Sequence, residues 1–139
     1  MIREMLSDEE VASTFATMRE LRPHLKEDEY VPAIRRMRVT DGFRLAAVIE
    51  GAARPCVAGF RLGENLARGR FLYVDDLVTL ESARSRGHGK AMLDWLTATA
   101  RAAGCAVVLL DSGVQRHGAH RFYLRERFDI TGHHFLKLL

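Results

Sequence analysis

A basic loop with two glycines lies between an apolar segment and an amphipathic one. In this loop Arg84, Arg86 and Lys90 surround Gly87 and Gly89. Glycine lets a backbone approach a ligand without a Cβ clash, and the free N–H groups at a helix start attract anions. The segment therefore predicts a phosphate or pyrophosphate site. Two common nucleotide fingerprints, GxGxxG and GxxxxGK followed by Ser or Thr, do not match it.

Two adjacent carboxylates, Asp75 and Asp76, stand shortly before this loop. The pattern from Arg70 to Leu80 predicts a strand, in which successive side chains point to opposite faces. At least one of the two carboxylates then points toward the covered face, where it is costly unless it is paired. A structural role is open to both, because either could bind backbone N–H groups or an arginine.

The pattern Arg84-x-x-Gly87-x-Gly89, between a strand and a helix, resembles the pyrophosphate loop of the GNAT family of acyl-CoA-dependent N-acetyltransferases. A second match is Ala119-x-x-x-Tyr123, a pattern that the family carries on a later helix. The expected order of elements is similar from end to end. The resemblance implies acetyl-CoA as cosubstrate and an α/β fold with a mixed, mostly antiparallel central sheet flanked by about four helices.

The resemblance also assigns cofactor contacts. The backbone of Leu77 to Thr79 would pair with the pantetheine arm of CoA, and the loop from Arg84 to Lys90 would hold the pyrophosphate. The implied cofactor-binding residues are Leu77, Val78, Thr79, Arg84, Ser85, Arg86, Gly87, His88, Gly89, Lys90 and Ala119.

Catalytic roles follow from the same resemblance. Tyr123 stands where the family places the general acid that protonates the departing CoA thiolate; the alternative is an aromatic that packs its helix onto the sheet. An acid just before the loop would accept the amine proton through water. We favour Asp75, which is expected to share a face with Tyr73 and Leu77, with Asp76 second.

Two positions depart from the family pattern. Arg116 replaces an asparagine that often precedes the alanine, which leaves the CoA contacts at that edge open. Arg127-Phe128 replaces the usual Gly-Phe at the helix end. Because arginine tolerates left-handed geometry poorly, we expect this helix end to differ locally.

The function implied is transfer of an acetyl group from acetyl-CoA to a primary amine of a small molecule or peptide, by direct attack. Neither cysteine indicates a covalent acyl-enzyme. A second hypothesis keeps the fold as a non-catalytic acyl-CoA-binding regulatory or interaction module, in which Tyr123 and the aspartates are dispensable. A third is a nucleotide-binding protein that uses the same anion site.

Hydrophobic periodicity and turn residues predict the elements that position these groups. Ser7 and Glu10 form a capping box at the start of the first helix. The predicted helices span about 8–21, 29–37, 87–103 and 117–125. The predicted strands span about 43–49, 55–62, 70–80, 105–110 and 132–138, and residues 1–6 are open as a short strand. The segment 105–110 is continuously apolar, so we expect it to be buried on both faces.

Length and composition limit the class of protein and the number of domains. With 139 residues, 47% hydrophobic and 28% charged, the chain suits one globular domain, 1–139. A net charge of +3 is too small to indicate nucleic acid. The longest apolar run, Cys105 to Leu110, is far shorter than a membrane span, and no secretory signal precedes it. Cys56 and Cys105 fit core thiols of a reducing compartment, so a cytoplasmic location is expected.

The remaining features carry weaker expectations. The six histidines, including His133 and His134, show no metal-ligand spacing, so no metal is expected. The apolar segment Phe135 to Leu139 is a candidate edge for a homodimer. We expect the helices around Arg19–Arg38 and the loop Gly63–Arg68 to recognise the amine acceptor. Acids at Glu20, Glu27, Asp28 and Glu29 would favour a cationic amine such as a polyamine or lysine.

Overall fold

The computed structural model describes residues 1–139, which divide into two compact units, Met1–Leu109 and Leu110–Leu139. In chain order the elements are β1 (Ile2–Glu4), α1 (Asp8–Ala12), α2 (Phe15–Leu21), α3 (Glu27–Asp41), β2 (Arg44–Val48), β3 (Cys56–Asn65), β4 (Gly69–Thr79), the 3-10 helix η1 (Glu81–Ala83), α4 (His88–Ala102), β5 (Val107–Leu110) and α5 (His117–Arg125). A single domain over 1–139 stays a prediction.

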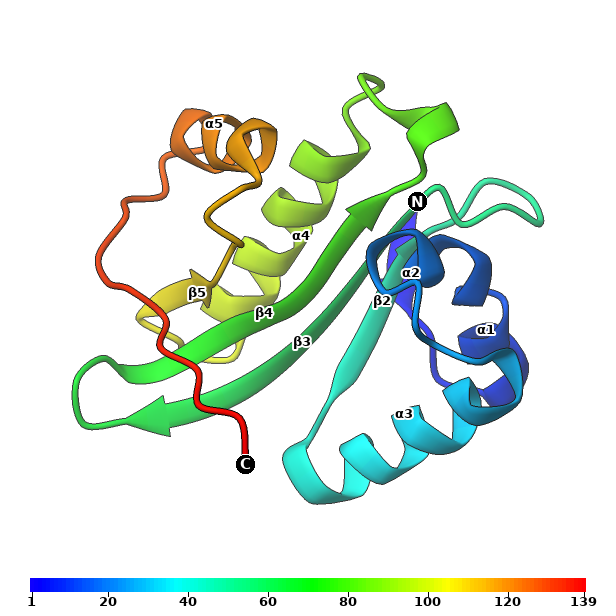
Figure 1. The fold of residues 1–139 in the computed structure, drawn as a ribbon, viewed down its shortest axis with the longest axis horizontal. Coiled ribbons are helices and arrows are strands. Elements are labelled where there is room, and N and C mark those ends of the chain that lie inside the picture. Colours follow the sequence, from blue (N-terminus) through cyan, green and yellow to red (C-terminus); the bar gives the residue numbers. More distant parts are fainter. The chain divides into compact units, whose positions relative to one another are not determined.

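The five strands form one sheet in the order β1-β2-β3-β4-β5, and the pairs from β1 to β4 are antiparallel. This confirms the predicted mixed α/β fold. In the first unit, α1, α2 and α3 cover one face of the sheet and α4 covers the other (Figure 1). The first face buries Phe43, Val57 and Val78 under Phe15 and the other core residues of these helices. On the α4 face, Phe60 packs edge-on against Trp95, with ring centroids 6.0 Å apart.

The predicted helix 8–21 is two helices, which raises the number of α-helices to five. The break falls at Ser13 and Thr14. Their hydroxyls donate to the carbonyls of Glu10 and Val11, at 2.6 and 2.7 Å. Such side-chain bonds compete with the backbone ladder of a helix, and here they coincide with its interruption.

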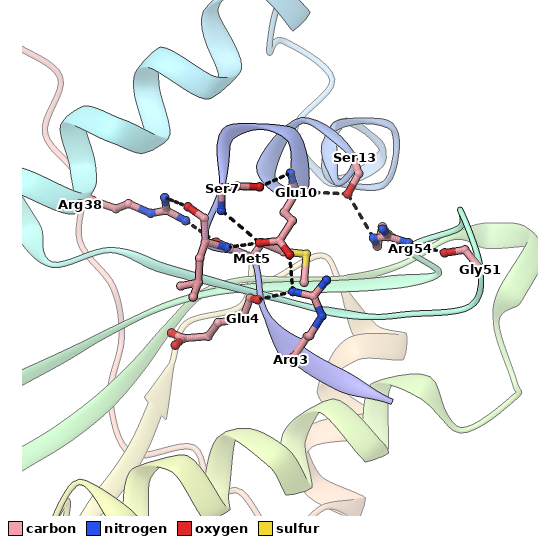
Figure 2. A network of polar contacts seen from close by, with 10 residues as sticks. Arg3, Glu4, Met5, Ser7, Glu10, Ser13, Arg38, Gly51 and Arg54 are labelled. Carbon is pink, nitrogen blue, oxygen red and sulfur yellow. Dashed lines mark hydrogen bonds and ion pairs between the residues drawn. The ribbon is translucent and has the colours of Figure 1, made fainter.

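The start of α1 has the predicted capping box. Ser7 Oγ accepts the N–H of Glu10 at 3.1 Å, and Glu10 Oε2 accepts the N–H groups of Ser7 and Leu6 at 3.1 and 2.8 Å. Arg3 on β1 donates to the other carboxylate oxygen, so Glu10 joins the strand to the helix (Figure 2). The two backbone N–H donors, followed by Arg3, lower the pKa of Glu10 to about 2.

The strand β5 is shorter than the predicted 105–110 and is half-buried along its four residues, so burial on both faces is wrong. Periodicity alone identifies an apolar run but does not tell how much of its surface is covered.

In the second unit α5 spans His117–Arg125, as predicted, and residues 126–139 form no helix or strand. The predicted strand 132–138 is therefore wrong. Its apolar side chains, Phe135, Leu136 and Leu138, are exposed. A strand requires a partner edge as well as apolar composition, and composition alone misled the prediction.

The end of α5 keeps left-handed geometry although the residue there is arginine. Arg127 has φ +67°, its N–H donates to the carbonyl of Leu124 at 3.1 Å, and the N–H of Phe128 donates to the carbonyl of Tyr123 at 3.0 Å. These two bonds form a Schellman motif, which the rings of Tyr123 and Phe128, 5.8 Å apart, accompany. The expected local difference at this helix end is wrong: the arginine adopts the strained geometry.

No helix of the structure combines the length and the apolar character that crossing a membrane requires. The cytoplasmic location and the homodimer stay predictions.

Candidate active site

A β-bulge in β4 sets the positions of the two aspartates. Gly59 pairs with Asp76 and Phe60 pairs with Val74, so Asp75 is an extra residue with no partner across the ladder. Side chains on both sides of a bulge no longer alternate as in a regular strand. The predicted placement of the two carboxylates on opposite faces is therefore wrong.

Both carboxylates bind side chains on the face that α1 to α3 cover. Arg61 on β3 lies on this face. It shares the face with Gly59 and Val57, because residues two apart in a strand point the same way, and Val57 belongs to the core under these helices. Arg61 binds the carboxylate of Asp75, and Arg22, directly after α2, binds the carboxylate of Asp76. The bulge thus gathers two acids and two arginines at one point of the sheet.

The pair of Arg61 and Asp75 is bidentate. Arg61 Nε lies 2.9 Å from Oδ2 and Nη2 lies 2.8 Å from Oδ1. The guanidinium carbon also lies 5.3 Å from the centroid of the Tyr73 ring. The carboxylate of Asp75, foremost by its hydrogen bonds, raises the pKa of Arg61 above its usual value. Asp75 therefore serves to hold the arginine in one orientation.

Asp76 is the more deeply buried acid, with a side chain 14% exposed against 23% for Asp75. Arg22 Nε donates to Asp76 Oδ1 at 2.9 Å, and Arg22 Nη2 donates to the carbonyl of Asp75 at 3.1 Å. Asp76 Oδ2 accepts no hydrogen bond from the protein. Burial raises the pKa of Asp76, and the bond from Arg22 opposes that rise.

Gly59 makes room for this carboxylate. A Cβ atom at Gly59 would lie 2.6 Å from Asp76 Oδ2 and 2.4 Å from Cζ of Phe43. No side chain other than hydrogen fits between the acid and the aromatic ring without a shift.

The predicted anion loop joins η1 to α4. Ser85 and Gly87 have φ +63° and +82°, and Gly87 caps α4 without a side-chain hydrogen bond. The N–H groups from Ser85 to Gly89 donate to no protein acceptor. Five consecutive free donors at a helix start form a cradle for an anion. The left-handed Ser85 is a strained position of the kind that clusters at functional sites.

The basic side chains of the loop differ in their partners. Lys90 pairs with Asp94 at 2.8 Å, and Arg84 is exposed and makes no ion pair. Arg86 Nη2 and His88 Nε2 each lie 3.4 Å from Glu50 Oε1, on the β2–β3 connection. His88 is nearly buried, and its Nε2 makes no well-aligned hydrogen bond. Glu50 thus lies against both Arg86 and His88, beside the free N–H groups.

The predicted pantetheine contacts, Leu77 to Thr79, form the end of β4 and pair with β3 through Ala58, Val57 and Cys56. On the other side, Ala106 just before β5 bonds the carbonyl of Arg70 near the start of β4. A strand of four residues beginning there follows β4 for only part of its eleven residues. The outer edge of β4 at Leu77 to Thr79 therefore extends beyond β5.

In the second unit, α5 carries Ala119 and Tyr123, both half-buried. The ring of Tyr123 contacts the rings of Phe122 and Phe128, with centroids 5.4 and 5.8 Å apart. The bond from the N–H of Phe128 to the carbonyl of Tyr123 fixes the backbone under this ring. Arg116, the first departure from the family pattern, is the N-cap of α5 and makes no side-chain cap bond.

Three residues that shape the site were not predicted from the sequence, namely Arg22, Arg61 and Glu50. Each lies far along the chain from the acids or cations that it binds. The spacing of two between Gly59 and Arg61 in an apolar strand indicated that the two share a face. The β3–β4 register and the bulge were needed to place Arg61 beside Asp75. No group of three His, Cys, Asp or Glu side chains forms a metal-binding arrangement, and the absence of a metal stays a prediction.

Comparison with known proteins identifies the class as acetyltransferases. The model of the acetyltransferase (GNAT) family matches residues 3–128. An uncharacterized N-acetyltransferase of Bacillus subtilis, YhdJ, is 35% identical over 122 residues, which make up 88% of this chain and 86% of that protein. An aminoalkylphosphonate N-acetyltransferase of Salmonella typhimurium is 36% identical over 66 residues, 48% of this chain and 43% of that protein.

Similarity to solved structures covers the whole chain. An aminoglycoside N-acetyltransferase, AAC(6')-Iy, in complex with CoA matches with a TM-score of 0.86, covering 100% of this chain and 93% of that chain. Its sequence identity is 13%, so this likeness concerns the fold.

The chain therefore belongs to the GNAT family of acetyltransferases. It is an acyl-CoA-dependent N-acetyltransferase, which transfers an acetyl group to an amine.

Proposed function

We propose that the bulge in β4 is where the amine of a small molecule attacks acetyl-CoA, and that Asp76 accepts its proton. The observation that carries this proposal is the free Oδ2 of Asp76, an acid that is buried enough for its pKa to be raised. A base must be deprotonated yet keep an affinity for the proton, and a raised pKa brings a carboxylate closer to that balance.

Asp75 is the weaker choice for the base, although sequence analysis favoured it. Its two oxygens are occupied by the bidentate pair with Arg61. Neither oxygen of Asp75 is therefore left without a donor. Asp75 instead fixes Arg61, and Asp76 has the oxygen that is open to a proton.

Acetyl-CoA would bind through the loop and the end of β4. The free N–H groups from Ser85 to Gly89 and the exposed Arg84 suit the pyrophosphate. The edge of β4 at Leu77 to Thr79 would pair with the pantetheine arm, and Ala119 would contribute from α5. The binding of acetyl-CoA itself, rather than a longer acyl-CoA, is part of the proposal.

The reaction then needs two proton transfers. The amine nitrogen forms a bond to the thioester carbon, and its proton passes to Asp76, directly or through water. A backbone N–H near Val78 stabilises the oxyanion. As the C–S bond breaks, Tyr123 donates its phenolic proton to the CoA sulfur, which makes the thiol the leaving group. No covalent acyl-enzyme is required.

Small amines are the proposed acceptors. Two of the similar proteins carry names for acceptors of this kind, an aminoalkylphosphonate and an aminoglycoside. The names differ from each other, so they support small amines as a class.

The decisive experiment measures CoA release at saturating acetyl-CoA over an amine panel and over pH. We expect Asp76→Asn to lower kcat/KM by about 10²- to 10⁴-fold, the usual range for a general base. Asp75→Asn should cost less, and Tyr123→Phe should lower kcat with little change in CoA binding. Asp76→Asn with a wild-type pH profile would contradict the base assignment. Tight CoA binding with no release for any amine would support the binding-module hypothesis instead.

A further inference from the structure

Two arginines flank the proposed base, and both are oriented by the acids beneath them. Arg61 donates from Nε and Nη2 to the carboxylate of Asp75. Arg22 donates from Nε to the carboxylate of Asp76 and from Nη2 to the carbonyl of Asp75. Tyr73 further restrains the Arg61 guanidinium from its ring face. Neither guanidinium moves freely, because each makes at least two bonds from one edge.

The other edge of each guanidinium is open. Nη1 of Arg22 and Nη1 of Arg61 donate to no protein acceptor. The arginine side chains are 42% and 40% exposed, whereas the paired acids are 14% and 23% exposed. The guanidinium groups are therefore more exposed than the carboxylates that they bind, and of the four carboxylate oxygens Asp76 Oδ2 alone accepts no hydrogen bond.

This difference in exposure favours one chemical class of acceptor. A plain cation would meet the more exposed guanidinium groups, which repel it, before it reached the acids. A molecule with an acidic group at one end and an amine at the other would place a negative charge on the arginines and the amine near Asp76. Arginine forks match phosphonate, phosphate and carboxylate oxygens in geometry as well as charge.

The acids that sequence analysis linked to a polyamine or lysine do not strengthen a cation site. Glu20 Oε2 accepts the N–H of Glu81 at 3.0 Å and so ties α2 to the start of η1. Glu27, Asp28 and Glu29 occupy the exposed first turn of α3, where negative charge complements the helix dipole.

We propose that the acceptor is a small zwitterionic amine whose acidic group binds the open edges of Arg22 and Arg61. The inference rests on the proposed function, because it takes the amine to react beside Asp76. It goes further by naming the group that the acceptor must carry in addition to its amine. Phosphonate and carboxylate share this chemistry, and the test separates them.

The test uses matched amines with the full-length protein. 2-Aminoethylphosphonate and β-alanine carry an acid, propylamine lacks it, and spermidine is a polycation. We expect kcat/KM for the better of the two zwitterions to exceed that for propylamine by at least tenfold, mainly through KM. Calorimetry with CoA-loaded protein should show the same order of affinity without turnover. Whichever of the two acids binds more tightly identifies the preferred oxyanion.

Variants assign the preference to the arginines. Arg61→Gln and Arg22→Gln should each reduce the preference for the zwitterion over propylamine by at least fivefold, and Arg61→Lys should restore part of it by keeping the charge. Arg101→Gln is the matched control, since Arg101 is an exposed arginine on α4, the helix of the opposite sheet face. It removes the same charge and should leave the preference unchanged. Melting temperatures show that each variant is folded.

The outcomes separate this inference from the base assignment. Equal affinity and equal kcat/KM for the zwitterions and propylamine, or a preference for spermidine, would overturn the inference even if Asp76→Asn abolished turnover. An arginine-dependent preference that persists while Asp76→Asn remains active would support the inference and contradict the base role.

Discussion

Gly59 and Asp76 face each other across the β3–β4 ladder with no space for a further carbon atom. A Cβ at Gly59 would stand 2.6 Å from Asp76 Oδ2 and within 2.8 Å of two ring carbons of Phe43. Next to this pair the bulge inserts Asp75 into β4, and the Asp76 carboxylate binds Arg22. One glycine thus determines where the proposed base lies.

We predict that Gly59→Ala destabilises the protein by about 1–3 kcal/mol, because overpacking forces the ring or the carboxylate to move. The same shift should lower kcat/KM even where the protein remains folded. Thermal unfolding and steady-state kinetics measure the two effects. Gly132→Ala is the control, since a Cβ there meets no atom within 4 Å. Wild-type stability and kcat/KM in Gly59→Ala would show that the site tolerates the added methyl group.

The raised pKa of Asp76 makes a prediction about stability and pH. A carboxyl group whose pKa is raised on folding contributes stability below its unfolded value, near 3.8, and this contribution is lost as pH rises through the folded value. Asp76→Asn removes the charge but keeps an acceptor for Arg22. We expect the variant to lose less stability than wild type as pH rises from about 3.8, and to be at least as stable at pH 7. Denaturant unfolding at several pH values measures this, and a variant less stable only at pH 7 would contradict it.

The pKa shift of Glu10 on folding has the opposite sign to that of Asp76. The pKa of Glu10 is lowered from 4.5 to about 2, so its contribution is present above about 4.5 and is lost as pH falls toward 2. We expect Glu10→Gln to show a weaker loss of stability on acidification than wild type, and a lower melting temperature at pH 7. Glu9→Gln, one residue earlier in α1, is the control. If both variants showed the same pH dependence, the capping box would not be its source.

The capping box and the glycine-containing loop before α4 could be predicted from sequence, because each depends on residues within one short segment. Ser7 and Glu10, and likewise Arg84 to Lys90, carry their own local geometry. The helix at 117–125 has the predicted bounds, and the helix predicted at 29–37 extends over Glu27–Asp41. Boundaries are less well determined by pattern than the existence of an element.

The arrangement around Asp76 could not be predicted, because it depends on register. A bulge shifts every later side chain of β4 relative to β3, and no sequence pattern around Asp75 or Asp76 predicts the bulge. Arg22 is separated from Asp76 by 54 positions, so only the packing of α2 brings them together.

Gly87 tests the proposed cofactor loop. It has φ +82°, so alanine there costs about 1–2 kcal/mol in the conformation that presents the free N–H groups. We expect Gly87→Ala to bind CoA about 5- to 30-fold more weakly by calorimetry, since 1.4 kcal/mol corresponds to a factor of ten. The control Gly132→Ala should bind normally. An unchanged Kd in Gly87→Ala would place the pyrophosphate elsewhere.

The end of α5 offers a gain of stability. Arg127 occupies the C′ position of a Schellman motif with φ +67°, a geometry that glycine adopts without a Cβ penalty. We expect Arg127→Gly to stabilise the protein by about 1 kcal/mol, a rise in melting temperature of about 2–4 °C for a chain of this size. Arg125→Gly, two residues earlier inside α5, should instead lose about 1 kcal/mol, because glycine weakens a helix interior. The opposite signs of two identical substitutions separate the left-handed strain from the loss of an arginine. A melting temperature lowered equally by both would mean that the Arg127 side chain contributes more than its backbone geometry costs.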